Sequence, residues 1–132
     1  MSSESLHESA EVIGAETVDT HRAIVSLMEE LEAIDWYNQR AKATADPSLR
    51  AVLEHNRDEE KEHAAMALEW LRRTDPKFAQ HLKTFLFTEG PITEIEAEMV
   101  QGQGGGEADG ASAGVSDGSL GIGSLRKAGG NK

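Results

Sequence analysis

The chain has 132 residues, no cysteine, and a formal net charge of −11 from 24 acidic and 13 basic residues. This length suits one small domain with a tail, and the absence of cysteine excludes disulfides and thiolate metal sites. The acidic balance argues against nucleic acid as the main partner, because phosphate groups need a basic surface.

No stretch of the sequence approaches the roughly 20 consecutive apolar residues that a membrane helix needs. The first eleven residues are polar and acidic, unlike a secretory signal. We therefore expect a soluble, cytoplasmic protein with no membrane partner.

Residues 1–14 are rich in Ser and Glu and lack periodicity, which predicts a disordered N-terminal arm ending near Gly14. Residues 16–45 have a helical pattern, because apolar side chains recur every three or four positions. The members of this stripe are Ile24, Leu27, Met28, Leu31 and Ile34. The sequence predicts one long first helix here.

Asp46 and Pro47 mark a break and a restart, since Asp can cap a helix and Pro suits its first position. A second long helix is expected over residues 47–73. Because the connection is very short, the two helices should form an antiparallel hairpin. Asp75-Pro76 repeats the signal and starts a third, shorter helix, and residues 91–100 add a short acidic one. No segment alternates like a strand, so the fold is predicted to be all-α, with the helical domain over residues 15–100.

The composition changes after Val100, since residues 101–132 hold eleven of the thirteen glycines. This predicts a disordered, Gly-rich C-terminal tail whose first part, residues 101–117, is a flexible linker.

Glu60 and His63 form a Glu-x-x-His motif, which a helix places on one face, one turn apart. Projected on a helix, both fall in the middle of the apolar stripe of the second helix. A buried carboxylate needs a partner, which is a metal, a cation or a proton. From spacing alone, a metal site and a satisfied Glu–His hydrogen bond are equally good readings.

Glu30 lies at the edge of the apolar stripe of the first helix, with Tyr37 seven residues on along nearly the same line. In the hairpin Glu30 can face Glu60 and His63. This set is half of the ligand set of ferritin-like di-iron bundles, which use two single Glu residues and two Glu-x-x-His motifs. Two hairpins related by a two-fold axis would complete a four-helix bundle with two irons at the interface. The sequence therefore predicts a homo-oligomer.

Two further strips of side chains could attract cations. Glu29, Glu32 and Trp36 lie beside Glu30 and could guide cations inward, although a solvated helix face also explains them. His55, Glu59 and Glu62 lie on one strip of the second helix, displaced from its apolar stripe. They could bind a hard cation, and an ordinary charged surface is the alternative.

Three segments together resemble the encapsulated ferritins, the ferritin-like cargo proteins of bacterial encapsulin shells. They are residues 28–37 (MEELEAIDWY), 56–63 (NRDEEKEH) and 86–92 (LFTEGPI). The resemblance covers about residues 15–97 and is specific, because the three segments agree in order and spacing. It implies a ferritin-like fold and assembly as a ring of dimers, with a decamer expected.

The resemblance also implies roles for the residues at the matching positions. Glu30, Glu60 and His63 would be ligands of a Fe²⁺/Fe³⁺ di-iron ferroxidase centre at a subunit interface, with Tyr37 close by. It implies that Glu29, Glu32 and Trp36 line the path by which metal reaches the centre. It further implies that His55, Glu59 and Glu62 can hold Ca²⁺.

Near the C-terminus, residues 117–127 (DGSLGIGSLRK) are similar to encapsulin cargo-loading peptides, and residues 118–132 are therefore expected to be the targeting peptide. Leu120, Ile122 and Leu125 offer small apolar anchors, and the glycines let the peptide lie close to a groove. The resemblance implies docking to the encapsulin shell protein through residues 118–127, inside a nanocompartment in the bacterial cytoplasm. An idle low-complexity tail is the alternative.

These expectations combine into a ferroxidase that oxidises Fe²⁺ to Fe³⁺ with dioxygen and supplies iron to the shell for storage. The alternative is a non-catalytic metal-binding or scaffold cargo protein. A di-iron or manganese oxygenase acting on an organic substrate is a third reading, for which the sequence offers no obvious apolar pocket.

Overall fold

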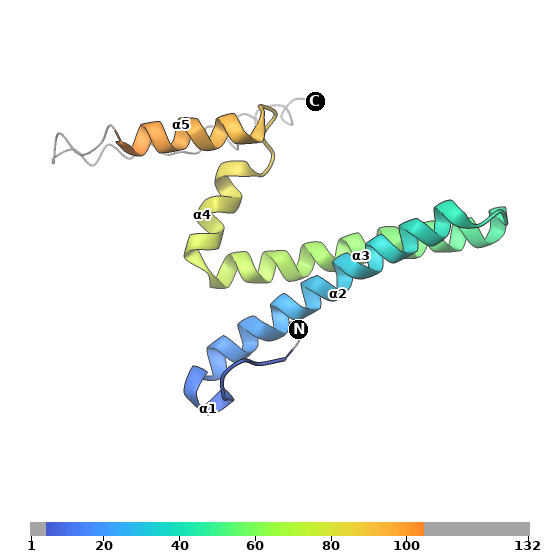
Figure 1. Ribbon diagram of the computed structural model, residues 1–132, viewed down its shortest axis with the longest axis horizontal. Coiled ribbons are helices and arrows are strands. Elements are labelled where there is room, and N and C mark those ends of the chain that lie inside the picture. The colour runs from blue at the N-terminus through green and yellow to red at the C-terminus, as the bar shows by residue number, and fades with distance from the viewer. Residues whose placement is uncertain (1–4, 105–132) are drawn as a thin grey trace, which may run out of the picture. The chain divides into compact units, whose positions relative to one another are not determined.

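The regular structure of the protein is helical throughout the part described, residues 5–104 of a computed structural model (Figure 1). The helices are α1 (Ala10–Ile13), α2 (Ala15–Ala43), α3 (Pro47–Thr74), α4 (Pro76–Phe85) and α5 (Ile92–Gly104). No strand occurs within these residues, so the all-α prediction is confirmed. None of the helices in this range combines the length and the apolar character that a membrane span requires.

Helices α2 and α3 form an antiparallel hairpin, as the sequence predicts (Figure 1). They contain 29 and 28 residues, and at about 1.5 Å per residue each is about 40 Å long. Residues 44–46 alone connect them. This hairpin belongs to a compact unit that ends at Phe78, and a second unit begins at Ala79.

The start of α3 fixes the turn of the hairpin. Asp46 is its N-cap, where the side chain accepts a hydrogen bond of 2.9 Å from the backbone N–H of Ser48, and Pro47 occupies the first turn. One turn later, Arg50 donates hydrogen bonds to the carbonyl oxygens of Ala41 and Thr44, at 3.2 and 2.7 Å. The carbonyl of Ala41, in the last turn of α2 where carbonyls lack a partner within the helix, is thereby satisfied from α3.

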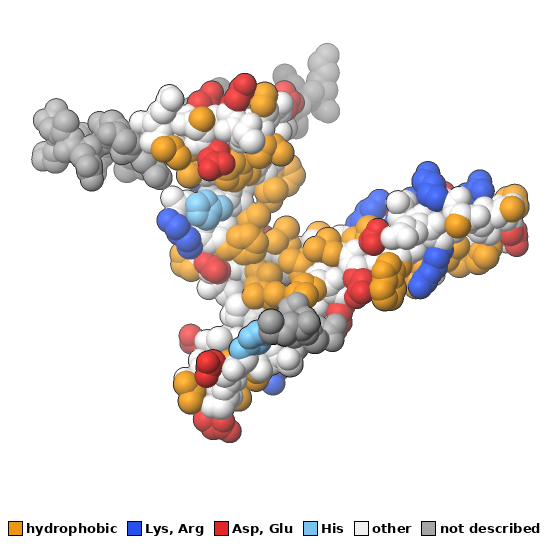
Figure 2. Space-filling view, in the orientation of Figure 1, with side chains coloured by type: hydrophobic (Ala, Val, Ile, Leu, Met, Phe, Trp, Pro, Cys, Tyr) orange, Lys and Arg blue, Asp and Glu red, His pale blue; other side chains and the backbone are white. Residues whose placement is uncertain are grey.

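The hairpin buries little apolar surface. Ala41, Ala64 and Leu71 are its buried hydrophobic residues, and many of the larger apolar side chains stay more than a third exposed. On α2 and α3 these exposed residues are Ile24, Met28, Leu31, Trp36, Leu49, Val52, Met66 and Trp70. Figure 2 shows hydrophobic side chains gathered on the surface of α2 and α3. An apolar surface of this extent is typical of a face that packs against another protein chain.

Helices α1 and α5 differ from the sequence prediction. Helix α1 lies in the segment predicted to be a disordered arm, and Gly14 closes it with φ 85° and an N–H bond of 3.0 Å to the carbonyl of Ala10. Helix α5 continues to Gly104, beyond the predicted helix end at Val100. A glycine costs a helix only about 1 kcal/mol, so the change in composition did not set the boundary. Residues 105–132, with most of the predicted linker and the predicted cargo-loading peptide, lie outside the described residues.

Candidate metal centre

One group of metal-ligating side chains lies where α2 faces α3. Helix α3 presents Glu60 and His63 from successive turns, and α2 presents Glu30 opposite them. Within residues 5–104 this is the only group of three or more such side chains whose ligand atoms converge, and they all lie within 4.8 Å of one another. His63 Nδ1 is 3.0 Å from Glu60 Oε2 and 3.8 Å from Glu30 Oε2.

The group is sheltered by the hairpin on the side of its carboxylates. The side chains of Glu30 and Glu60 are 28% and 22% exposed, while His63 is 43% exposed. A metal ion, water or a second chain can therefore reach the group from the side of the imidazole. The facing arrangement expected from the sequence is present, and the binding of metal by these residues stays a prediction.

The three side chains shift one another's pKa values. A hydrogen bond with Glu60 and partial burial raise the pKa of Glu30, while bonds to Glu30 and His63 lower the pKa of Glu60. The hydrogen bond to Glu60 also raises the pKa of His63. Two carboxyl groups can hydrogen-bond to each other only if one carries a proton, so such a bond requires one proton between the two.

Metal binding at this group should depend on pH, because a metal ion must displace these protons. His63 has a pKa above its ordinary value of 6.5, so protons compete with metal up to and beyond that pH. We expect the affinity for Co²⁺, used as a probe, to rise about 10-fold per pH unit while one proton is displaced, and then to level off. Calorimetric titration from about pH 6 to pH 8 measures this, and a flat affinity across the range would contradict it.

Two carboxylates and one imidazole form a donor set that suits iron, manganese or zinc. They supply three ligands, which is fewer than the six positions of an octahedral ion such as Fe²⁺. One chain therefore leaves positions for water, for dioxygen or for ligands from another chain. The residues present fit a transition-metal ion, and the set is incomplete within one chain.

Tyr37 and Trp36 lie further along α2, and both rings are close to one cation, Arg40. The guanidinium carbon of Arg40 is 5.7 Å from the centroid of the Tyr37 ring and 5.8 Å from that of Trp36, within cation–π range. Trp36 is half exposed. Glu29 and Glu32 are exposed on the same helix and do not join the converging group.

The strip on α3 that the sequence analysis considered for Ca²⁺ does not converge. His55 Nε2 lies 3.3 Å from Glu59 Oε1, with both side chains more than half exposed. Glu62 lines a shallow hollow with Met66 and Trp70 instead, and within the described range these residues form no three-membered ligand group. Ca²⁺ binding at this strip stays a prediction.

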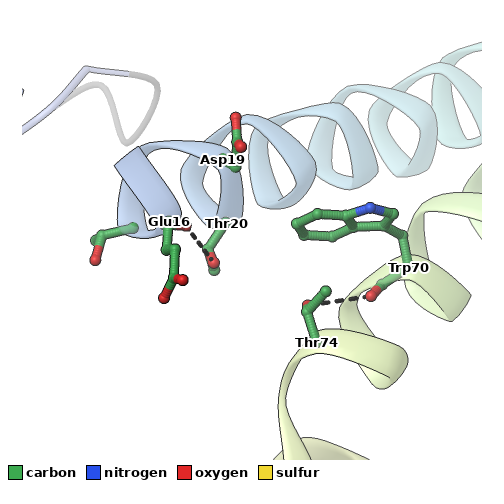
Figure 3. A pocket seen from close by; sticks show the side chains of 6 residues that line it. Glu16, Asp19, Thr20, Trp70 and Thr74 are labelled. Carbon is green, nitrogen blue, oxygen red and sulfur yellow. Dashed lines mark hydrogen bonds between the residues drawn. The ribbon is translucent and has the colours of Figure 1, made fainter. Parts of the chain in front are cut away.

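A cleft of about 540 Å³ lies where the N-terminal part of α2 faces the C-terminal part of α3 (Figure 3). Its lining residues are Glu16, Thr17, Asp19, Thr20, Trp70 and Thr74. The hydroxyls of Thr20 and Thr74 donate to backbone carbonyls of their own helices, and Asp19 pairs with Arg22 at 2.8 Å. These polar groups already have partners, so the cleft is not a second ligand set.

Arg57 links α3 to α2 through Asn38 beside the metal group, and no sequence pattern predicted a role for either residue. Arg57 Nη1 donates a hydrogen bond of 3.0 Å to Asn38 Oδ1, and the Arg57 side chain is only 19% exposed. The sequence did contain one sign of this contact: Arg57 lies one turn before Glu60, on a helix whose apolar stripe was expected to pack against the first long helix.

A long helical hairpin with Glu-x-x-His on one helix and Glu opposite it on the other defines a ferritin-like helical protein. Among ferritin-like proteins, the match to a family model is specific. This chain belongs to the EncFtn-like family, whose model matches residues 5–89.

Known relatives cover most of the chain. It is 65% identical to a Rhodospirillum rubrum protein named "Encapsulated ferritin-like protein", over 95% of this chain and 90% of that one. It is 41% identical over 59 residues to the Myxococcus xanthus "Encapsulin nanocompartment cargo protein EncC", which is 45% of each chain. The crystal structure of protein ne0167 from Nitrosomonas europaea superposes with a TM-score of 0.64 and 60% identity, over 66% of this chain and 96% of that one.

Proposed function

We propose that this protein is a ferroxidase, which oxidises Fe²⁺ to Fe³⁺ with dioxygen at a di-iron site shared by two copies of the chain. The observation that carries the proposal is the convergence of Glu30, Glu60 and His63 within 4.8 Å on the facing sides of α2 and α3. Membership of a ferritin-like family supports iron as the metal.

Two copies are needed to complete the site. Each chain offers three ligands and exposes large apolar residues on α2 and α3. A two-fold dimer would bury this surface in a four-helix bundle and bring six ligands to two ferrous ions. We propose that such dimers assemble further into a ring, with a decamer as the expected size.

The residues of the site have distinct tasks in the reaction. Two bound Fe²⁺ ions give two electrons, which with two protons reduce one dioxygen to hydrogen peroxide. The carboxylates of Glu30 and Glu60 stabilise the Fe³⁺ product, and the imidazole of His63 favours the binding of Fe²⁺. Tyr37 is proposed to lie near the reacting pair.

Two neighbouring strips have proposed accessory roles. Exposed Glu29 and Glu32, with half-exposed Trp36, could concentrate cations on the route to the site. The strip of His55, Glu59 and Glu62 is proposed to bind Ca²⁺ when a second chain or water completes it, since its own side chains do not converge.

We propose that the protein works as cargo inside an encapsulin shell in the bacterial cytoplasm. Relatives are named as encapsulated or as encapsulin cargo, which supports this location. Residues 118–127 are proposed to bind the shell protein, and an open bundle leaves mineral storage to the shell.

Anaerobic titration with Fe²⁺, followed by oxygen, tests the proposal. Native mass spectrometry should find one iron per subunit and an even number of subunits. Admission of oxygen should then produce ferric absorbance far faster than in buffer. Iron binding without oxidation would leave a metal-holding cargo protein, and turnover of an organic substrate would indicate an oxygenase. Either result would overturn the ferroxidase proposal.

A further inference from the structure

Two arginine side chains of α3 donate hydrogen bonds across the hairpin, at two places between its turn and the metal group. Arg50 joins α3 to the end of α2 through the carbonyls of Ala41 and Thr44. Arg57 joins α3 to α2 through the side chain of Asn38. The later residue on α3, Arg57, contacts the earlier residue on α2, Asn38. This order is the one expected for two antiparallel helices in a single register.

Arg57 is the contact close to the metal group. It precedes Glu60 by three residues, which is about 4.5 Å along the helix axis, on nearly the same helical face. Arg50 precedes Glu60 by ten residues, or about 15 Å. A helix that slides by one residue moves its side chains by about 1.5 Å and turns them by about 100°, enough to separate Glu30 from Glu60 and His63.

The guanidinium of Arg57 is itself held in place. Its Nε and Nη2 donate to the two carboxylate oxygens of Asp58, at 2.9 and 3.4 Å. Lys61 Nζ binds the same Asp58 at 3.0 Å from the next turn. Nη1 is then directed across to Asn38.

We propose that Arg57, with Asn38, is a positioning residue for the metal site. By fixing the register of α2 on α3 one turn from Glu60, it sets the separation of Glu30 from Glu60 and His63. Arg57 thereby determines the geometry of the three ligands, in addition to any effect on the stability of the hairpin. This inference rests on the proposed metal site.

Binding of Co²⁺ tests the inference, because the visible absorption of Co²⁺ reports its ligand geometry directly. Arg57→Gln should weaken Co²⁺ binding roughly 10-fold and alter the absorption bands, as loss of a group that orients a ligand does elsewhere. Asn38→Ala removes the same bond from the other helix and retains the charge of Arg57. It should have a similar effect, and the double variant should be no worse than either single one.

Arg50→Gln is the matched control. It removes arginine bonds between the same two helices, so it should lower the melting temperature about as much as Arg57→Gln. Its Co²⁺ affinity and absorption should stay within about 2-fold of the unaltered chain. Arg57→Lys should recover part of the affinity, since an ammonium group can still reach Asn38.

Three results separate the possible failures. If the unaltered chain does not bind Co²⁺, the proposed metal site is wrong and the inference falls with it. If Arg57→Gln and Arg50→Gln weaken binding equally, Arg57 acts only through stability. If Asn38→Ala binds normally while Arg57→Gln does not, the charge of Arg57 matters and its position does not. Each of the last two overturns the positioning role.

Discussion

His63→Ala is expected to abolish the proposed ferroxidase activity and metal binding, and no other single substitution in the chain should have a larger effect. His63 supplies the nitrogen ligand of the converging group, and its Nδ1 lies within 4 Å of both carboxylates. Loss of a group that only orients a ligand costs roughly 10- to 100-fold in metal affinity, so loss of a ligand should exceed that. The dissociation constant for Fe²⁺ under argon and the rate of ferric absorbance under oxygen measure the effect.

His81→Ala is a matched control for the loss of a histidine, because His81 is exposed on α4 and lies outside the converging group. It should bind and oxidise iron as the unaltered chain does. Glu30→Ala should resemble His63→Ala, and if metal bridges two chains, both variants should also form a weaker oligomer. Full activity in both variants would show that the site lies elsewhere.

The hairpin could be predicted because its signals are local. Asp46, Pro47 and Asp75 have the predicted capping and first-turn chemistry, and both long helices end within two residues of their expected bounds. Apolar spacing was enough to place Glu30, Glu60 and His63 on facing sides. The ends of α1 and α5 were less predictable. The glycine and polar residues there change the free energy of helix formation by only about 1 kcal/mol each.

The separation of the ligands could not be predicted in the same way. It depends on the sliding and rotation of α2 on α3, which bonds between residues far apart in sequence determine. Arg57 and Asn38 are nineteen positions apart, and no spacing pattern connects them. The exposure of Leu31, Leu49 and Val52 likewise becomes visible only when the hairpin is formed, although their periodicity suggested burial. A second chain reconciles the two observations, because it would cover a face that one hairpin leaves open.

Removal of residues 118–132 is expected to abolish packaging in the encapsulin shell and to leave iron oxidation unchanged. The proposed anchors, Leu120, Ile122 and Leu125, all lie in the removed segment, whereas the ligand group lies on α2 and α3. Co-expression with the shell protein, followed by gel filtration and quantification of the protein that elutes with the shells, measures packaging. We expect co-elution to fall to background while the Fe²⁺ oxidation rate per subunit does not change.

A triple replacement of Leu120, Ile122 and Leu125 by Ser should reproduce the deletion, since the apolar anchors then disappear at constant length. A matched deletion of residues 128–132 should leave packaging intact. Several tails on one ring would bind multivalently, so one tailless subunit per ring should be tolerated and a wholly tailless ring should not. Persistent packaging of the wholly tailless ring would locate the shell contact on the helical bundle.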